Sequence, residues 1–314
     1  MRKFLILLFL TFLSLGCSSR KNGPDYVFDS KKKKELYIQS YNNTLKSWAI
    51  PFEEKDIKTS YGIAHVIITG PKTGEPLVLL HGTDASSTMW LPNIEAFSKD
   101  YRVYAIDFPL ETGKSVSYRI KLSNKQTGKF YHQIFQHFDM KNINLLGISR
   151  GGWMATYLSL QPENDVKKIV LLSPAQTFAG VENLGKVLTA INFKMFPGPK
   201  SMDKFFNAFS YYPEKINSVF KQQLLCAYKY GNSKPRLLYM TKFSKKELKS
   251  LKLPVLLLIG DHDIVNSEKI LIKAKKYLPN VETDIITNAG HFMTSDQTEI
   301  INKKVIEFLN KNSN

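Results

Sequence analysis

Cysteine is scarce in this chain: its 314 residues include only Cys17 and Cys226. The two side chains could form a disulfide only in an exported protein. Cys17, however, ends an N-terminal apolar segment, which indicates a different use for its thiol. Cys226 is then left without a partner, and we expect it to be a buried small apolar residue.

Acidic residues are also few, since 44 lysines and arginines stand against 27 aspartates and glutamates, a formal net charge of +17. No basic helix, zinc-ligand spacing or basic run interleaved with aromatics accompanies the lysines. We therefore expect a solvated basic surface and no nucleic-acid partner; attraction to anionic lipid head groups is the alternative. The two aspartates beside His262 match no compact ligand set, so we expect no metal there. We also expect no cofactor.

One long apolar run stands at the N-terminus, where residues 1–17 read MRKFLILLFLTFLSLGC. Two basic residues precede an apolar stretch that is too short for a comfortable membrane-spanning helix, and Cys17 stands at the expected cleavage point. The segment resembles the signal of bacterial lipoproteins, although Ser14 stands where that pattern prefers leucine. The resemblance implies that 1–16 is a signal peptide and that Cys17 carries a diacylglyceryl group and anchors the protein. An ordinary signal peptide or an uncleaved anchor are the alternatives.

Residues 17–34 continue as CSSRKNGPDYVFDSKKKK. We expect this polar segment to be a flexible tether that holds the folded domain off the membrane. The lysine run at its end suits contact with anionic lipid.

The rest of the chain alternates short apolar runs with longer helical stretches. Seven runs are typical of strands, mostly buried on both faces, and they span residues 64–69, 76–80, 102–106, 143–146, 168–172, 254–259 and 281–286. This alternation predicts an α/β fold with a mostly parallel sheet flanked by helices. Residues 176–250 contain many aromatics and no clear strand, and we expect a helical cap insertion there. The core then consists of 35–175 and 251–314.

A serine stands between glycines in GISRGGW, residues 147–153, directly after one of these predicted strands. This spacing also occurs by chance, so the context decides whether Ser149 is a nucleophile. Asp263 and His291 follow two later predicted strands. Because the carboxyl ends of parallel strands share one edge of a sheet, the three side chains can meet there. The chain order Ser, Asp, His is that of the α/β-hydrolase arrangement.

From about residue 57 to the C-terminus the chain resembles the α/β-hydrolase superfamily. The resemblance rests on four motifs, which are HG at 81–82, GISRG at 147–151, GDHD at 260–263 and GH at 290–291. It implies that Ser149 is the nucleophile, that His291 is the base, and that the acid is Asp263, with Asp261 as the second choice. The base removes the proton of the serine hydroxyl, and a buried carboxylate holds the histidine in the required tautomer.

An oxyanion hole needs two N–H donors. The backbone N–H of Arg150 directly follows the nucleophile at the start of a helix, which makes it one candidate. The resemblance implies that the second donor is the backbone N–H of Thr83.

Together these patterns predict a membrane-anchored serine hydrolase that cleaves a small carboxylic ester with an apolar part through an acyl-enzyme on Ser149. We expect it in the bacterial cell envelope, facing the extracytoplasmic side. One alternative is a peptidase similar to proline iminopeptidases, which commonly carry an acidic subsite for the substrate amine. The other is a non-catalytic lipoprotein that uses the same fold to bind a partner.

Overall fold

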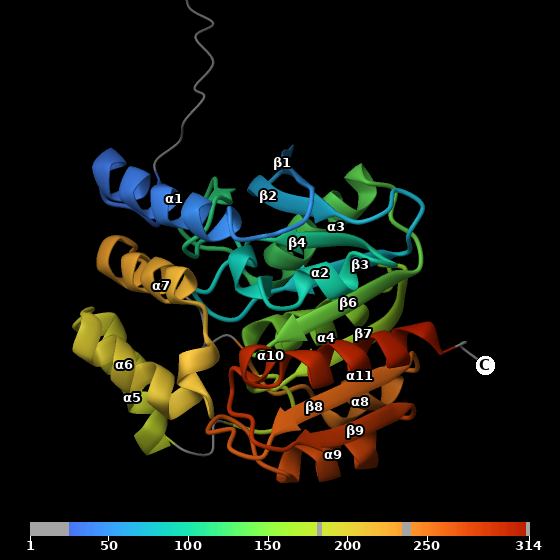
Figure 1. Cartoon of the computed structure of the whole chain (residues 1–314). Coiled ribbons are helices and arrows are strands. Elements are labelled where there is room, and N and C mark those ends of the chain that lie inside the picture. The colour runs from blue at the N-terminus through green and yellow to red at the C-terminus, as the bar shows by residue number, and fades with distance from the viewer. Residues whose placement is uncertain (1–24, 181–183, 234–239, 312–314) are drawn as a thin grey trace, which may run out of the picture.

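A computed structural model of the chain describes residues 25–180, 184–233 and 240–311. Within these residues nine strands form one sheet in the order β1-β2-β4-β3-β6-β7-β8-β9, with β5 paired to β2 (Figure 1). Six of the strands run parallel to one another, and they are β3 (Pro76–Leu80), β4 (Arg102–Ile106), β6 (Ile143–Ile148), β7 (Val166–Leu172), β8 (Val255–Gly260) and β9 (Val281–Ile286). Their carboxyl ends therefore meet along one edge of the sheet.

The N-terminal end of the sheet is antiparallel. β1 (Phe52–Lys58) pairs with β2 (Gly62–Thr69), and β2 pairs with β4 and with the short β5 (Val116–Ser117). β1 reads FEEKDIK and buries only Ile57, because it lies at the edge of the sheet. Its mostly charged sequence lacks the apolar run by which seven of the other strands were predicted; the two-residue β5 was not predicted either.

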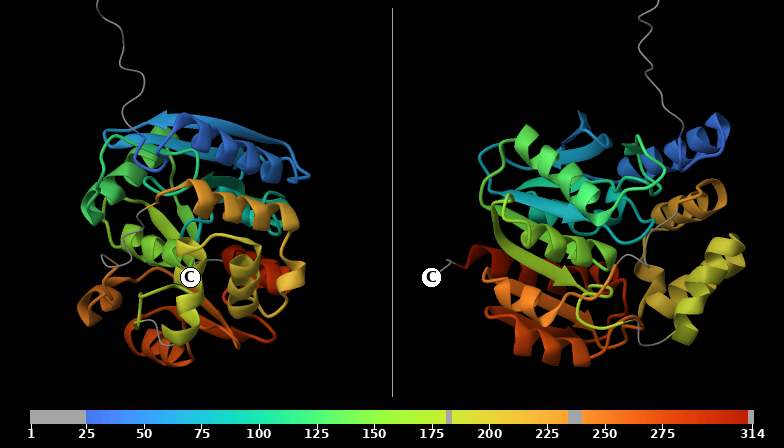
Figure 2. Two further views of the ribbon diagram at one scale, coloured as in Figure 1. Left: turned by 90° about the vertical axis from the view of Figure 1, so that its left-hand side faces the viewer. Right: turned by 180° about the vertical axis from the view of Figure 1, so that it is seen from behind.

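Helices cover both faces of the sheet, which confirms the predicted α/β fold. The packing pairs α2 (Ile94–Phe97) with α11 (Thr298–Asn310) on one face and α3 (Asn124–His137) with α4 (Arg150–Ser159) on the other (Figures 1 and 2). Near the last strands, α8 (Lys245–Ser250) contacts α9 (Lys269–Tyr277), which packs on β9.

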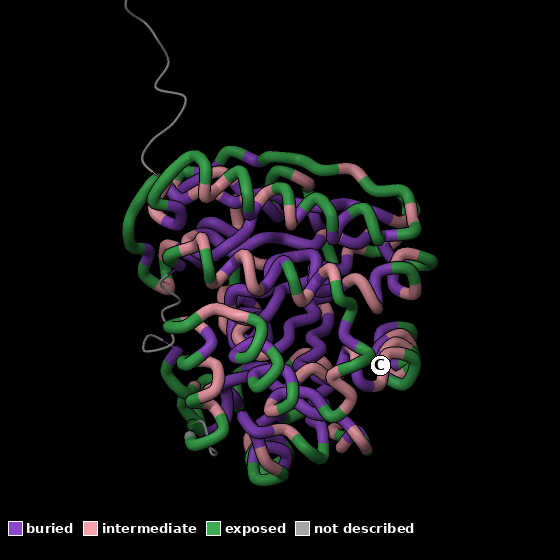
Figure 3. The backbone as a smooth tube through the Cα atoms, turned by 60° about the vertical axis from the view of Figure 1, so that its left-hand side comes forward, coloured by how far each residue is buried: buried purple, intermediate pink, exposed green. Residues whose placement is uncertain are grey.

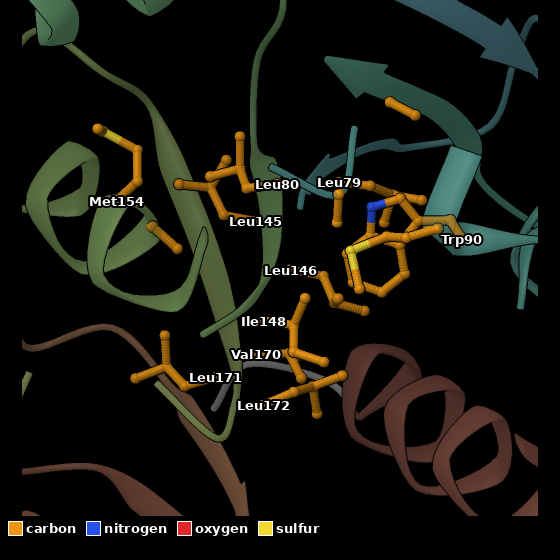
Figure 4. Packing of buried hydrophobic residues seen from close by; sticks show 14 of the residues in the cluster. Leu79, Leu80, Trp90, Leu145, Leu146, Ile148, Met154, Val170, Leu171 and Leu172 are labelled. Atoms are coloured by element: carbon orange, nitrogen blue, oxygen red, sulfur yellow. The ribbon is translucent and has the colours of Figure 1, made fainter. Parts of the chain in front are cut away.

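Side chains from the central strands fill the space on both sides of the sheet. Successive residues of a strand point to opposite faces, so Leu145 points toward Met154 of α4 and Leu146 toward Trp90 (Figure 4). All four of these side chains are buried. The buried stretches follow the strands through the centre of the molecule, and the exposed ones follow the outer turns of the helices (Figure 3). Burial on both faces explains why these strands read as continuous apolar runs.

Three helices of the region 176–250 stand together at the carboxyl-end edge of the sheet. They are α5 (Leu184–Met195), α6 (Pro199–Phe209) and α7 (Ser218–Tyr230). Figure 1 shows them on the side toward which the arrows of β8 and β9 point. The described residues of this region form no strand of the sheet. Cys226 of α7 is partly buried and packs against the apolar core, so it is less buried than we expected.

The segment before the first strand differs from the tether that we expected at 17–34. From residue 25 onward it is folded: Phe28 is buried and forms a bridge with Gly231, and α1 (Lys31–Leu45) begins inside the lysine run. The helix forms because the Ser30 side chain caps it and because Tyr37 and Tyr41, four residues apart, are fully buried on one stripe. The Tyr37 hydroxyl accepts from Gln223 of α7, and the Tyr41 ring contacts His65 of β2. The predicted signal peptide, Cys17 and the rest of residues 1–24 lie outside the described residues.

In the part of the chain that is described, no helix is both long enough and apolar enough to cross a membrane.

A buried histidine ties the edge strand β1 to β2. The His65 Nδ1 lies 2.8 Å from Asp56 Oδ1, and the Nε2 lies 2.9 Å from Glu54 Oε2. Burial alone lowers the pKa of His65, but the hydrogen bonds to Asp56 and Glu54 outweigh it and raise this pKa to about 9. The imidazolium form is therefore part of the folded structure at neutral pH.

We predict that the stability of the protein falls between about pH 6.5 and pH 9. The unfolded chain loses the His65 proton near pH 6.5, whereas the folded chain keeps it up to about pH 9, so the folded state is favoured fully below this interval and progressively less across it. Denaturant melts should show a loss on the order of 1–3 kcal/mol across the interval. The His65→Gln variant should lose most of this slope, and a variant with the wild-type slope would contradict the assignment.

Candidate active site

Ser149 lies in a strained turn between β6 and α4. Its backbone adopts φ 53° and ψ −117°, a conformation that few residues other than glycine occupy. The Ser149 N–H donates to the carbonyl of Leu172 at 2.9 Å, which attaches the turn to the end of β7. A Cβ placed on Gly151 would lie 1.9 Å from the Leu80 carbonyl oxygen, so only glycine allows α4 to start against the end of β3.

Asp263 and His291 are hydrogen-bonded to each other. The two atoms, His291 Nδ1 and Asp263 Oδ1, lie 3.0 Å apart, and the Asp263 side chain is completely buried. Burial by itself raises the pKa of the Asp263 carboxyl, but His291 and the backbone N–H of Val265 hold this pKa below its usual range. Asp263 is thus an anion beside the imidazole. His291 and Ser149 line the same pocket.

Asp261, the second choice for the acid, makes different contacts. Its carboxylate accepts hydrogen bonds from the backbone N–H groups of Asn288 and Ala289, at 3.0 and 3.1 Å, and lies 2.8 Å from His262 Nδ1. These contacts shape the loop before His291. Of the two aspartates, the structure therefore brings Asp263 and not Asp261 to His291.

The loop after β3 faces the turn that carries Ser149. A Cβ placed on Gly82 would lie 3.7 Å from Ser149 Cβ, and the next residue, Thr83, lines the same pocket as Ser149. His81 holds this loop from below: its Nε2 accepts from the Phe108 N–H at 2.9 Å, and its Nδ1 lies 2.7 Å from the Gly82 carbonyl. Complete burial lowers the pKa of His81 to about 4, so it is neutral, as an Nε2 acceptor must be.

The pocket beside Ser149 has a volume of about 260 Å³. Its lining is mostly apolar and comes from the core and from cap helices α5, α6 and α7, through Met89, Ile148, Val187, Ala190, Ile191, Phe205, Phe209, Tyr228, Val265 and Phe292. The charged residues in this lining include Asp84 and Lys194, whose Oδ2 and Nζ atoms pair with each other at 3.0 Å. Because Lys194 belongs to α5, this ion pair joins the cap to the loop after β3.

Two buried acids near the site were not predicted from the sequence. Asp296 accepts from the Gly290 N–H at 2.8 Å, from the backbone N–H groups of Tyr211 and Tyr212, and from the Ser210 hydroxyl, so it joins the His291 loop to the end of α6. Glu111 forms an ion pair with Arg150. Neither acid follows a predicted strand or belongs to a motif, so no sequence signal marked them.

Within residues 25–180, 184–233 and 240–311, no three His, Cys, Asp or Glu side chains are grouped so that they could hold a metal ion.

Comparison with known proteins places this geometry in a family. The family profile described as the alpha/beta hydrolase fold matches residues 75–227. The uncharacterized carboxylesterase nap of Bacillus subtilis (strain 168) is 30% identical over 286 residues, which cover 87% of this chain and 92% of that protein. Carboxylesterase YbfK of the same organism is 29% identical over 284 residues, which cover 87% of this chain and 93% of that protein.

A solved structure has the same architecture. The naproxen esterase (carboxylesterase NP) of Bacillus subtilis superposes with a TM-score of 0.84 at 28% identity and covers 90% of this chain and 100% of its own. The sheet order, the turn at Ser149 and the similarity over most of the chain agree with one another. The chain belongs to the α/β-hydrolase family, and within it is a carboxylesterase-like serine hydrolase.

Proposed function

We propose that the protein hydrolyses a small carboxylic ester through an acyl-enzyme on Ser149 and that it works while anchored to a membrane through Cys17. The observation that carries the chemistry is the Asp263–His291 hydrogen bond beside a pocket that both His291 and Ser149 line.

In the first step His291 Nε2 takes the proton of the Ser149 hydroxyl while Ser149 Oγ bonds to the ester carbonyl carbon. The carbonyl oxygen becomes an oxyanion, and the backbone N–H groups of Thr83 and Arg150 donate to it. The tetrahedral species then breaks its bond to the alcohol oxygen, which leaves with the proton held by His291. Asp263 stays ionised throughout and stabilises the imidazolium.

In the second step water replaces the alcohol. His291 removes a proton from the water, whose oxygen bonds to the acyl carbon of the acyl-enzyme, and the same two N–H groups stabilise the second oxyanion. Collapse of this species breaks the bond to Ser149 Oγ, which recovers its proton from His291. The products are the alcohol and the carboxylic acid, and the enzyme returns to its starting state.

The pocket lining favours an uncharged substrate with an apolar part. Its walls are mainly aliphatic and aromatic, and its small volume suits a compact ester. The carboxylate of Asp84 is already paired with Lys194, so it is not a free acidic subsite for the amine of a peptide substrate. This pairing favours the esterase over the peptidase related to proline iminopeptidases.

The N-terminal sequence carries the anchoring part of the proposal. Acylation of Cys17 would attach the chain stably to a lipid bilayer, because more than one acyl chain is added. Seven residues, 18–24, separate Cys17 from Asp25, the first described residue. Fully extended they span about 25 Å at most, so the folded domain would work close to the membrane surface of the bacterial cell envelope, on its extracytoplasmic side.

A fluorophosphonate probe should label Ser149 in the protein lacking residues 1–17. The probe imitates the tetrahedral species and needs the activated serine, so peptide mapping should place the label on Ser149. The His291→Ala variant should lose the label, and ester turnover should fall by about 10⁴-fold or more. The matched control is His262→Ala, an exposed neighbour that should keep both signals. A folded wild-type protein without any label would contradict the proposal and favour a non-catalytic binding role.

Substitution of the two aspartates, Asp263 and Asp261, should have different effects on kcat. Asp263→Asn should lower kcat by about 10³–10⁴-fold. An amide beside His291 Nδ1 favours the wrong tautomer of the histidine, and without a negative charge it does not stabilise the imidazolium. Asp261→Asn should leave kcat within about tenfold of wild type and act mainly through the loop at Asn288. Steady-state kinetics on a p-nitrophenyl ester would decide, and equal losses in the two variants would refute the assignment.

Membrane attachment can be measured directly. Cys17→Ser should move the full-length protein from the membrane fraction to the soluble fraction of the host envelope, because it removes the acylated thiol. Cys226→Ser serves as the matched control and should stay with the membrane. Mass spectrometry of the wild-type N-terminal peptide should find a lipid-modified cysteine, and an unmodified peptide would rule out acylation.

A further inference from the structure

Glu111 lies in the loop that follows β4, between the two segments that carry the proposed oxyanion donors. Its side chain is 1% exposed. On one side it meets residue 84, next to the donor Thr83, and on the other it meets the side chain of the donor Arg150. The mechanism above gives Glu111 no role, although a buried carboxylate is costly unless it is paired.

The contact with the first segment is made through the backbone. The Asp84 N–H donates to Glu111 Oε2 at 2.7 Å, and the hydroxyl of the neighbouring Thr112 donates to the Asp84 carbonyl at 3.1 Å. Asp84 has a φ of 58°, a left-handed conformation that needs such support. Residues 111 and 112 thus hold both polar groups of the backbone immediately after Thr83.

The contact with the second segment is an ion pair. The Arg150 guanidinium meets Glu111 Oε1 and lies 4.5 Å above the Phe108 ring, and its side chain is 12% exposed. Burial lowers the pKa of Arg150 to about 10, and the negative charge of Asp84 opposes this shift, so Arg150 remains a cation at neutral pH. Glu111 is a second buried acid beside this cation. Arg150 also offers its backbone N–H to the proposed oxyanion, and a fixed side chain restricts how its peptide group can move.

We propose that Glu111 is a positioning residue that holds the two halves of the oxyanion hole at a fixed separation, one oxygen on the Asp84 N–H and the other on the Arg150 guanidinium. The inference rests on the proposed function, because it takes Thr83 and Arg150 as the donors. Backbone donors can be aimed only by the segments that carry them, and stabilisation of an oxyanion depends on donors placed to within a few tenths of an ångström.

The test compares Glu111→Gln with wild type in three measurements. The amide keeps an acceptor for the Asp84 N–H but no longer pairs with the Arg150 cation, so kcat on a p-nitrophenyl ester should fall about 10- to 100-fold, less than the loss of a whole donor. Affinity for a trifluoromethyl ketone, which forms an oxyanion on Ser149, should fall by the same factor as kcat/KM. Binding of the intact ester, measured in a Ser149→Ala background, should change less than threefold.

The outcomes separate the inference from the function on which it rests. Unchanged kcat in Glu111→Gln overturns the positioning role, as does a loss of ester binding as large as the loss of kcat/KM, which would indicate general damage to the pocket. A wild-type protein that neither labels with fluorophosphonate nor hydrolyses esters removes the proposed function and this inference with it. The matched control is Glu75→Gln, a more exposed glutamate paired with Lys167 at the amino end of β3, which should keep wild-type kcat.

If Glu111→Gln does not fold, Thr112→Val takes its place. This variant removes the hydroxyl that holds the Asp84 carbonyl and leaves the Glu111–Arg150 pair intact. It should lower kcat about 3- to 10-fold and weaken the trifluoromethyl ketone in parallel, with ester binding unchanged. Wild-type kcat and ketone affinity in the folded variant would overturn the inference.

Discussion

The close approach of two backbone segments, the start of α4 and the end of β3, is the constraint on which the rest of the site depends. The α-carbon of Gly151 packs so tightly against the Leu80 carbonyl that no side chain fits between them. This contact leaves the chain no room for a wider turn after β6, and Ser149 is therefore held in a backbone conformation that it would not adopt alone. The same contact brings the loop at 81–84 beside the serine. The packing of Gly151 on Leu80 therefore positions both the nucleophile and the proposed oxyanion donors around it.

Buried polar side chains hold the loops around this contact. His81 is bonded within its own loop and to the loop after β4, Glu111 joins that second loop to Arg150, and Asp296 joins the His291 loop to the cap. Each of these groups would be costly to bury without its partners, so each fixes its partners in place. The Asp84–Lys194 ion pair likewise ties the loop after β3 to α5 of the cap. The loops at the catalytic edge of the sheet are therefore held by buried polar side chains, with apolar packing beneath them.

The sequence predicted the centre of the fold better than its margins. All seven predicted strands are present, because a strand buried on both faces must be apolar throughout and so stands out from its surroundings. The strand β1 went unrecognised because an edge strand can be charged on its exposed face. The first four residues of α1, the lysines 31–34, were taken for the end of a tether because they are all charged. The tyrosines that bury the helix follow them, and their partners, such as Gln223 of α7 and His65 of β2, lie far away in the sequence.

The sequence by itself determined the α/β fold, the strand-end positions of the serine, aspartate and histidine, and a short list of residues for each role. These follow from local patterns: apolar runs, glycines at a tight turn, and polar residues directly after strands. Only the tertiary structure decided that Asp263 rather than Asp261 faces His291, that Asp296 and Glu111 support the site, and that the cap closes an apolar pocket over Ser149. The reason is that these contacts are between residues far apart in the chain, and the residues come into contact only when the sheet brings their loops together.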